Sequence, residues 1–304
     1  MTEHYTCAHS GCAFKNLDEK GSSETIRETT FDFSRYEQGQ VSHKKTIDRS
    51  FLEWFVGFSE GDGSFVTSGS RLFFVINQKE ERVLRLVRSN LGFGKVSLYN
   101  GFYRYIVANR ENTDRLVALF NGNLVLERTN SRFLFWLNTR NLYSECKVLP
   151  LPPNRAMSLS KSAWFSGLVD ADGCFNVSKQ ADSRYSLGWR VRLRFVIDQK
   201  EERGALERVK SFLGGGNINE RAPLAGMLRF TSFNLSNHSV LVEYLSRFPL
   251  RSKKKIDYVR WLRVKGYIER RRAQPWEGKI LERVERLIKN SKKVDDRVQG
   301  LDES

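Results

Sequence analysis

The chain carries one sequence pattern twice, and this duplication limits its possible folds more than any other feature. The strings "WFVGFSEGDGSF" (residues 54–65) and "WFSGLVDADGCF" (164–175) are nearly the same. Each is followed by a second shared stretch, which is "FFVINQKEER" (73–82) in the first copy and "RFVIDQKEER" (194–203) in the second. Solenoid repeats are about 20 to 50 residues long, so a repeat of about 100 residues indicates a duplicated domain.

The segment between the two copies has the composition of a linker. Residues 147–163, "KVLPLPPNRAMSLSKSA", contain three prolines and several serines, which favour an extended chain. The polar start of the chain includes Cys7, His9 and Cys12, which lack the second half of a metal knuckle and fit a flexible tail better. We predict a flexible tail (1–45), a first repeat (46–146), a linker (147–160), a second repeat with a C-terminal helix (161–290) and a loose tail (291–304).

Hydrophobic periodicity predicts the same elements in each copy. In the first copy Phe51, Trp54, Phe55 and Phe58 form one apolar stripe of a helix. Gly92 marks the end of a later helix, and Asn100-Gly101 is typical of a tight hairpin. The expected elements are strands at 64–68, 71–76, 95–99 and 102–107, and helices at 80–90, 112–121 and 130–142. The sequence therefore predicts an α+β fold of two pseudo-symmetric αββαββα domains, each with one antiparallel sheet.

The charge balance favours a polyanionic partner. There are 51 Lys and Arg against 35 Asp and Glu, a formal charge of +16. In the strand expected at 190–197, Arg190, Arg192 and Arg194 share one face. A merely solvated face is the alternative, but the overall charge favours nucleic acid, and an antiparallel ribbon fits the DNA major groove.

Other compositional signals are weak. No apolar run approaches the roughly 18 residues of a membrane span, and the first residues lack the layout of a signal or transit peptide. Four cysteines are too sparse for a disulfide scaffold and favour a reducing compartment.

Small residues predict that the two motif helices touch. Gly57 and Gly61 are four residues apart in the first copy, as are Gly167 and Ala171 in the second. Small residues at this spacing let two helix backbones approach closely. The alternative is two unrelated helices, each packed on its own sheet. The duplication favours a pseudo-twofold pair, because it puts the same small face on both copies.

Such a pair brings two acids together at the helix ends. Asp62 and Asp172 each follow the negative end of a helix dipole, so they repel each other and the dipoles. A hard divalent cation relieves this repulsion, and Mg²⁺ prefers such oxygen ligands. The backbone carbonyls of Gly61 and Ala171 are further candidate ligands. Glu60 and Asp170, two residues earlier, are more simply explained by structural hydrogen bonds than by catalysis.

The motifs "FVGFSEGDG" (55–63) and "FSGLVDADG" (165–173) resemble the signature of LAGLIDADG homing endonucleases in their single-chain, two-repeat form. The resemblance covers about residues 46–268. It implies a monomer with internal pseudo-twofold symmetry, in which the signature helices form the domain interface. It further implies that the two sheets form a saddle on duplex DNA, and that Asp62 and Asp172 bind the divalent metal.

The resemblance also implies other catalytic residues. A polar residue at the end of the second strand of each repeat matches Gln78 and Gln199. The resemblance also implies a basic catalytic residue before the last helix of each repeat. In the second copy the lysine run at 253–255 matches this position, and we predict Lys253. In the first copy the candidate is Arg128. Because the first copy has no such lysine, the two strands need not be cut at equal rates.

Base contacts are expected from outward residues of the strands. Arginine can bridge guanine, and glutamine can bridge adenine. The two copies differ strongly at these positions, so the expected target is asymmetric. Contacts to roughly 10 phosphates would give a log–log salt slope of about −9. The candidates are Ser64, Val66, Ser68, Arg71, Phe73 and Val75 in the first copy, and Asn176, Ser178, Gln180, Arg190, Arg192 and Arg194 in the second.

The leading functional hypothesis is a metal-dependent, site-specific endonuclease. It would hydrolyse both strands of a long double-stranded DNA target across the minor groove and leave staggered ends. The resemblance leaves two alternatives, an RNA maturase that binds its intron RNA and a non-catalytic DNA-binding regulator. The presence of both acids weakens the regulator. Such proteins are often encoded in organelle group I introns, so the resemblance implies a mitochondrion or another organelle, and no membrane.

Overall fold

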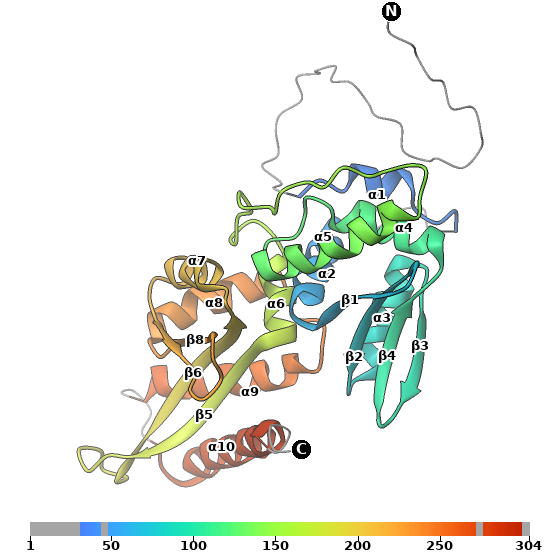
Figure 1. Ribbon diagram of the computed structural model, residues 1–304. Helices are drawn as coiled ribbons and strands as arrows, with labels where there is room; N and C mark the ends of the chain where they lie inside the picture. Colours follow the sequence, from blue (N-terminus) through green and yellow to red (C-terminus); the bar gives the residue numbers. More distant parts are fainter. Residues whose placement is uncertain (1–30, 44–47, 272–275, 300–304) are drawn as a thin grey trace, which may run out of the picture.

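The computed structural model describes residues 31–43, 48–271 and 276–299 (Figure 1). The cysteine and histidine segment near the start of the chain lies outside these residues.

The first repeat folds around one four-stranded antiparallel sheet with the strand order β1-β2-β4-β3. The predicted bounds of the third and fourth strands are confirmed, and the other elements begin or end within a few residues of the prediction. The elements are α2 (Arg49–Asp62), β1 (Gly63–Ser68), β2 (Arg71–Gln78), α3 (Glu81–Leu91), β3 (Lys95–Tyr99), β4 (Phe102–Val107), α4 (Arg110–Phe120) and α5 (Glu127–Leu142).

The second repeat has the same topology, with the strand order β5-β6-β8-β7. The α+β fold with two pseudo-symmetric halves is therefore confirmed. The shared order is αββαββαα and not αββαββα, and the second half carries α10 as a third helix at its end. The elements are α6 (Trp164–Asp172), β5 (Gly173–Ala181), β6 (Trp189–Lys200), α7 (Arg203–Leu213), β7 (Asn217–Glu220), β8 (Met227–Ser232), α8 (Leu235–Arg247), α9 (Lys254–Arg270) and α10 (Gly278–Gln299).

Alternation along the strands creates one buried and one open face on each sheet. In β2, Leu72, Phe74 and Ile76 are buried, whereas the residues between them are not. Helix α3 covers this core face with an apolar stripe that includes Val83 and Val87, and it ends at Gly92 in the left-handed conformation. The opposite face of the sheet is left for contacts outside the fold.

The helices α2 and α6 lie side by side between the two sheets (Figure 1). A Cβ atom on Gly57 would lie 2.0 Å from the carbonyl oxygen of Trp164, and one on Gly167 would lie 2.0 Å from that of Trp54. Only glycine permits this backbone contact, and it is reciprocal between the two copies. The predicted helix pair is therefore confirmed.

The predicted N-terminal tail is wrong for residues 31–43. Helix α1 (Ser34–Gln38) and its neighbours place Phe31, Phe33 and Tyr36 in the core of the first repeat, each no more than 4% exposed. The guanidinium of Arg115 also donates to the carbonyl of Gly39 at 2.7 Å. The aromatic residues of this stretch indicate a packed segment. The polar composition of the surrounding residues predicts a flexible one, which is why the segment was not predicted.

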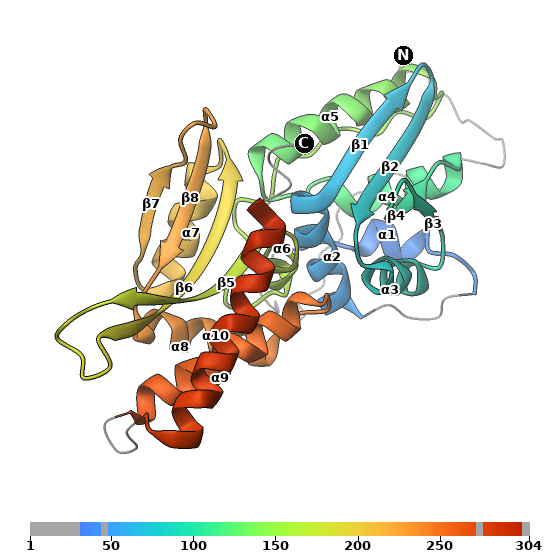
Figure 2. The same ribbon diagram turned by 90° about the horizontal axis from the view of Figure 1, so that it is seen from below.

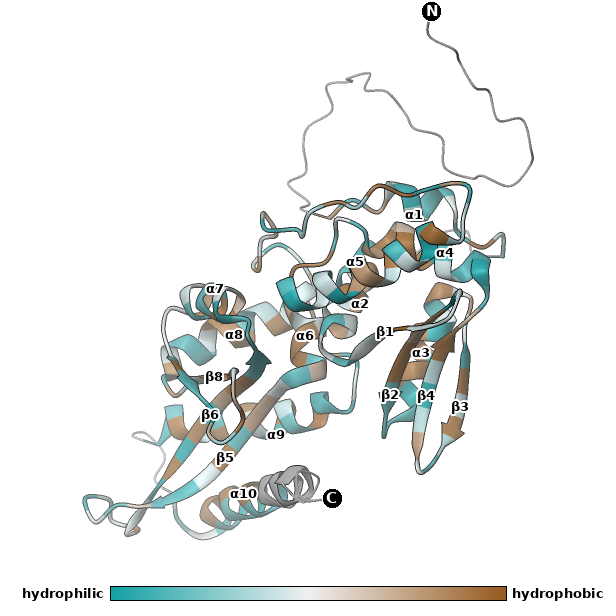
Figure 3. Ribbon diagram, viewed as in Figure 1, coloured by the Kyte–Doolittle hydropathy of each residue, from teal (hydrophilic) through white to brown (hydrophobic). Residues whose placement is uncertain are grey.

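The C-terminal helix is longer than expected. Helix α10 runs to Gln299, so the predicted loose tail is wrong for residues 291–299. Val284 and Ile288 are buried, and the ammonium of Lys179 on β5 lies 2.5 Å from Glu285. Figure 3 shows hydrophobic and hydrophilic residues alternating along the coloured part of α10, as expected for a helix packed on one side.

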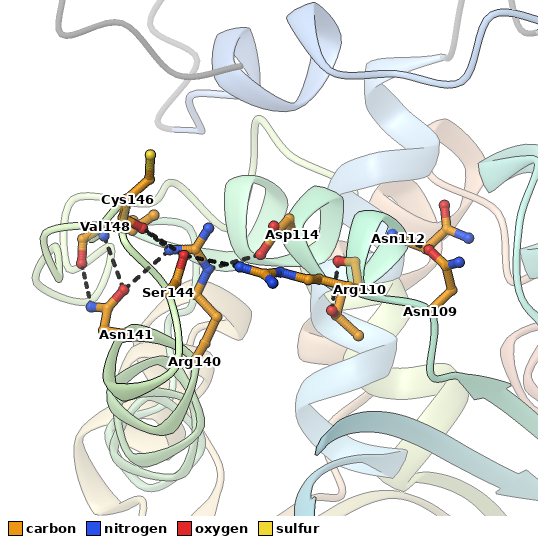
Figure 4. Close-up of polar contacts among 10 residues, drawn as sticks. Asn109, Arg110, Asn112, Asp114, Arg140, Asn141, Ser144, Cys146 and Val148 are labelled. Carbon is orange, nitrogen blue, oxygen red and sulfur yellow. Dashed lines mark hydrogen bonds and ion pairs between the residues drawn. The ribbon is translucent and has the colours of Figure 1, made fainter. Parts of the chain in front are cut away.

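The linker between the repeats is extended and fixed by hydrogen bonds (Figure 4). Arg140, near the end of α5, donates to Asp114 at 2.8 Å and to the carbonyl of Cys146. Asn141 exchanges two hydrogen bonds with the backbone of Val148, at 2.8 and 3.0 Å. These contacts hold the start of the linker against the first repeat.

Cys146 is disulfide-bonded, which argues against the expected reducing compartment, whereas Cys174 is not part of a disulfide. No described helix is long and apolar enough to cross a membrane.

Candidate active site and nucleic-acid interface

The two signature acids lie at the meeting point of the paired helices. Asp62 is the last residue of α2, and Asp172 is the last residue of α6. The approach is so close that a Cβ atom on Gly61 would lie 2.6 Å from Oδ2 of Asp172. The close packing of the helices thus places one carboxylate beside the other.

Burial favours the protonated forms of both acids. Burial and, next, the negative charge of Asp172 raise the pKa of Asp62 to about 7, against the lowering effects of Lys254 and Gln78. Burial also raises the pKa of Asp172, against the lowering effects of Lys254 and Gln199. Two half-buried carboxylates side by side are a site that a cation stabilises.

The residues present fit a magnesium ion. Mg²⁺ is usually held by one or two carboxylates, with water and substrate phosphate completing its shell. The part of the chain that the structure describes contains no cluster of three or more His, Cys, Asp or Glu side chains able to hold a metal. A metal at this centre would therefore depend on Asp62, Asp172 and an incoming phosphate. The carbonyl of Ala171, a predicted ligand, accepts a hydrogen bond from Lys254 at 2.8 Å.

Two glutamines orient the carboxylates, at the positions that the sequence predicts. The amide of Gln78 donates to Oδ2 of Asp62, and that of Gln199 donates to Oδ2 of Asp172 at 2.7 Å. Each glutamine lies near the end of the second strand of its repeat. The hydrogen bonds engage one oxygen of each carboxylate and leave the other for a ligand.

The structure brings Lys254 to the carboxylates in place of the predicted Lys253. The side chain of Lys253 is exposed, and its backbone N–H donates to Glu80 at 2.7 Å. Lys254 is the first residue of α9, and its ammonium reaches the end of α6. The sequence shows three adjacent lysines and cannot show where the helix begins, which decides which lysine points inward.

The predicted Arg128 does not form the matching contact in the first repeat. Its backbone N–H donates to Glu202 at 2.7 Å, and its guanidinium lies 3.9 Å from the carboxylate of Glu201. Among the described residues, Lys254 is the cation that lowers the pKa of both acids. The site is therefore asymmetric in its positive charge.

The earlier acid of each signature has a structural position, as predicted. Asp170 accepts hydrogen bonds from the indole of Trp54 at 2.8 Å and from Arg251 and Ser252. It thus holds the turn that precedes α9 and Lys254.

Glu60 has the corresponding position in the first repeat. It accepts from the indole of Trp164 and from the backbone N–H groups of Val125 and Leu126, just before α5. Each acid is bound by a tryptophan of the other repeat, so these bonds also join the two halves.

The open face of the first sheet carries all six predicted base-contacting residues. The register pairs Ser64 with Val75, Val66 with Phe73, and Ser68 with Arg71, so they share the face opposite the core. Their contact with bases stays a prediction. Three further residues lie on the adjoining part of this face and were not predicted, although strand alternation marks them: Asn77 on β2, Arg104 on β4 and Ser97 on β3.

The open face of the second sheet carries the other six. Asn176 pairs with Arg194, Ser178 with Arg192, and Gln180 with Arg190. Asn176 is buried and accepts from the guanidinium of Arg194 at 2.7 Å, so it positions the arginine as well as facing outward. The missed neighbours are Asp198 and Arg229, joined by two hydrogen bonds of 2.7 Å.

Comparison with known proteins gives one consistent result. The family model described as LAGLIDADG endonuclease matches residues 55–139 and 165–265. A "Probable intron-encoded endonuclease 4" of Neurospora crassa is 31% identical over 74% of this chain and 42% of its own length. An "Intron-encoded RNA maturase bI4" of Saccharomyces cerevisiae is 27% identical over 67% of this chain and 30% of its own length. The chain thus spans less than half of either relative.

Solved structures share the fold at low sequence identity. I-SmaMI bound to an uncleaved DNA target with calcium ions superposes with a TM-score of 0.65, at 18% identity, over 78% of this chain and 97% of that protein. The LAGLIDADG meganuclease I-AabMI bound to uncleaved DNA gives a TM-score of 0.64 at 16% identity, over 78% and 98%.

Proposed function

The chain belongs to the LAGLIDADG endonuclease family, and from this premise we propose that it is a site-specific homing endonuclease. It hydrolyses both strands of a long, asymmetric double-stranded DNA target and depends on a divalent metal. The observation that carries the proposal is the pair of carboxylates, Asp62 and Asp172, held together between two open sheet faces.

The residues of the centre divide the work of hydrolysis. Asp62 and Asp172 would hold the Mg²⁺ ion, which would supply an activated water and charge neutralisation at the leaving oxygen. Gln78 and Gln199 hold the carboxylates in place through their amide groups. Lys254 adds positive charge beside both acids, where negative charge develops on the phosphate.

The sheet faces supply binding and specificity. A curved antiparallel sheet fits the major groove, so each repeat would read one half of the target. The carboxylates between the sheets then face the minor groove at the centre, and the cuts on the two strands are staggered. The fold supplies both halves within one chain, which supports a monomer.

The decisive experiment is the substitution Asp172→Asn. The amide keeps the size and hydrogen-bonding capacity of the side chain but is a poor magnesium ligand. We expect near wild-type affinity for the DNA target and no double-strand cutting. The test DNA is the sequence made by joining the two exons that flank the intron carrying the reading frame, and cutting is measured on a linear substrate with Mg²⁺.

The matched control is Glu243→Gln, which makes the same charge change on an exposed side chain of α8. It should cut like the wild type. Wild-type cutting by Asp172→Asn would show that the site is wrongly assigned.

RNA maturation is a second candidate function. It is favoured by the similarity to the yeast protein named as an intron-encoded RNA maturase. The acids do not decide this question, because a maturase needs no cleavage centre. Splicing of the flanking intron RNA, with and without the purified protein, tests it directly.

The genomic setting is a further part of the proposal. Relatives include an uncharacterized cox1 intron-2 protein of Schizosaccharomyces pombe, 28% identical over 81% of this chain and 75% of its own length. We therefore place the reading frame in a group I intron of a mitochondrial gene, which the surrounding genomic sequence tests.

A further inference from the structure

An open groove of about 900 Å³ runs between α3 of the first repeat and α9 of the second. Figure 2 shows these helices on either side of the lower end of α2. We call it the inter-repeat groove. Its lining contains a single acid, Glu80, whose carboxylate already accepts the backbone N–H of Lys253. The seven basic lining residues are Arg82, Arg85, Arg251, Lys253, Lys255, Arg260 and Arg263.

Much of this positive charge is not neutralised by the protein. Three of the arginines have acidic neighbours outside the lining, such as Glu81 for Arg85 and Asp257 for Arg260. The other four cations, Arg82, Lys253, Lys255 and Arg263, form no side-chain ion pair within the described residues. Like charges gathered without partners repel one another, so the groove is stabilised by a polyanion.

The duplication provides an internal comparison. Arg82 corresponds to Arg203 in the two "QKEER" stretches, and the equivalent surface lies between α7 and α5. That surface contains paired charges: Arg155 lies 2.9 Å from Glu127, and Arg128 lies 3.9 Å from Glu201. Only one of the two equivalent surfaces is therefore a groove of unpaired positive charge. The fold that both repeats share does not require such a groove.

The groove lies behind the open sheet faces. Helix α3 packs Val83 and Val87 against the core face of the first sheet, and α9 packs Trp261 against Phe175 on the core face of the second. The groove is formed by the outer surfaces of these helices. A duplex lying along the open strand faces would leave most of the groove free.

The groove is lined by apolar as well as basic residues. The apolar ones are Leu86, Leu250, Val259 and Ile256, which is 55% exposed. Such a mixed lining fits an unpaired nucleotide, with its base against apolar side chains and its phosphates against basic ones. Bases inside a duplex are stacked and offer no free face to apolar side chains, whereas RNA loops offer splayed bases.

We propose that the inter-repeat groove binds an unpaired segment of a folded RNA. This site is separate from the DNA centre and does not depend on cleavage activity.

The test uses the full chain and a fluorescein-labelled RNA hairpin with a wide single-stranded loop. The double variant Arg82→Ala/Arg263→Ala removes one unpaired cation from each side of the groove. We expect binding to weaken roughly tenfold, and the log–log salt slope to fall by about 1.4, which is two contacts of about 0.7 each. The variant Arg203→Ala, at the equivalent position, should bind the hairpin like the wild type.

Any of four outcomes would overturn the proposal. The first is equal weakening by Arg203→Ala, which would indicate diffuse charge attraction. The second is equal affinity for the same RNA annealed to its complement. The third is better competition by an acidic peptide than by unlabelled RNA. The fourth is displacement of the hairpin by the DNA target, which would place the RNA on the sheet faces. DNA cutting by the wild type is measured separately, so failure of the nuclease proposal is distinguishable.

Discussion

Two acids only two residues apart have different roles because their side chains meet different neighbours. Asp170 accepts several N–H and O–H donors and fixes a turn, whereas Asp172 faces a second carboxylate, one amide and a lysine. A carboxylate saturated with protein donors has no oxygen left for a cation. The donors around each acid, and not its place in the motif alone, therefore separate structural from catalytic residues.

The identity of the active lysine can be tested at the level of single residues. Lys254→Ala removes the positive charge beside both acids, and it should lower the rate of DNA cutting by about 10² to 10³. Lys253→Ala removes an exposed side chain and should retain most of the wild-type rate. Single-turnover cutting of the bound target measures both. A larger defect from Lys253→Ala would contradict the assignment.

Glu60 gives the stability of the protein a specific dependence on pH. Burial raises its pKa from 4.5 to about 8. Between these values the folded protein retains a proton that the unfolded chain has released. The free energy of unfolding therefore falls as the pH rises through this window, by about 1.4 kcal/mol per unit at most.

Glu60→Gln cannot titrate, so its stability should decrease less between pH 5 and pH 8 than that of the wild type. Urea unfolding at both pH values measures the difference, with Glu243→Gln as the exposed control. Equal pH dependence in Glu60→Gln and wild type would show that Glu60 is ionised in the folded state.

At the scale of the elements, periodicity predicts most of the fold, because each repeat is built from local patterns. Alternation fixes β3 and β4, and the i, i+3, i+4 stripe fixes α2. Sequence patterns cannot predict where a helix begins after a turn, and this register decides between Lys253 and Lys254. They also miss α1, whose few aromatic residues gain stability only by packing against another segment.

The packing of α2 on α6 can be tested with one methyl group. In Gly57→Ala the new Cβ would lie 2.0 Å from the carbonyl oxygen of Trp164, which is backbone and cannot rotate away. We expect the free energy of unfolding to fall by at least about 3 kcal/mol, at the upper end of overpacking effects. The separated carboxylates should also lose cutting activity.

Gly204→Ala is the matched control for this substitution. Gly204 lies in α7, and a Cβ atom there would meet no other atom within 4 Å. Alanine should be neutral or raise the free energy of unfolding by up to about 1 kcal/mol. Denaturant unfolding measures the free energy of unfolding of both variants. Equal stability of Gly57→Ala and Gly204→Ala would contradict the close contact between α2 and α6.

At the scale of the whole molecule, duplication has produced symmetric architecture with asymmetric chemistry. The two halves share topology, the paired acids and the two glutamines. They differ on the open sheet faces, where three arginines of β6 stand against Arg71 and apolar residues of β2. They differ again at the centre, where Lys254 has no equivalent cation in contact from the first repeat within the described residues.

This asymmetry predicts that the two DNA strands are cut one after the other. Lys254 stands on the second repeat, so the phosphate nearer its ammonium should be hydrolysed faster than the phosphate on the opposite strand. With a supercoiled plasmid carrying the target, the nicked circle should accumulate before the linear form. Substrates labelled separately on each strand should identify one preferred strand. Lys254→Ala should slow the preferred strand more than the other, so that the two rates converge. Equal rates on both strands in the wild type would mean that a cation from the first repeat, such as Arg128, moves to the centre when DNA binds.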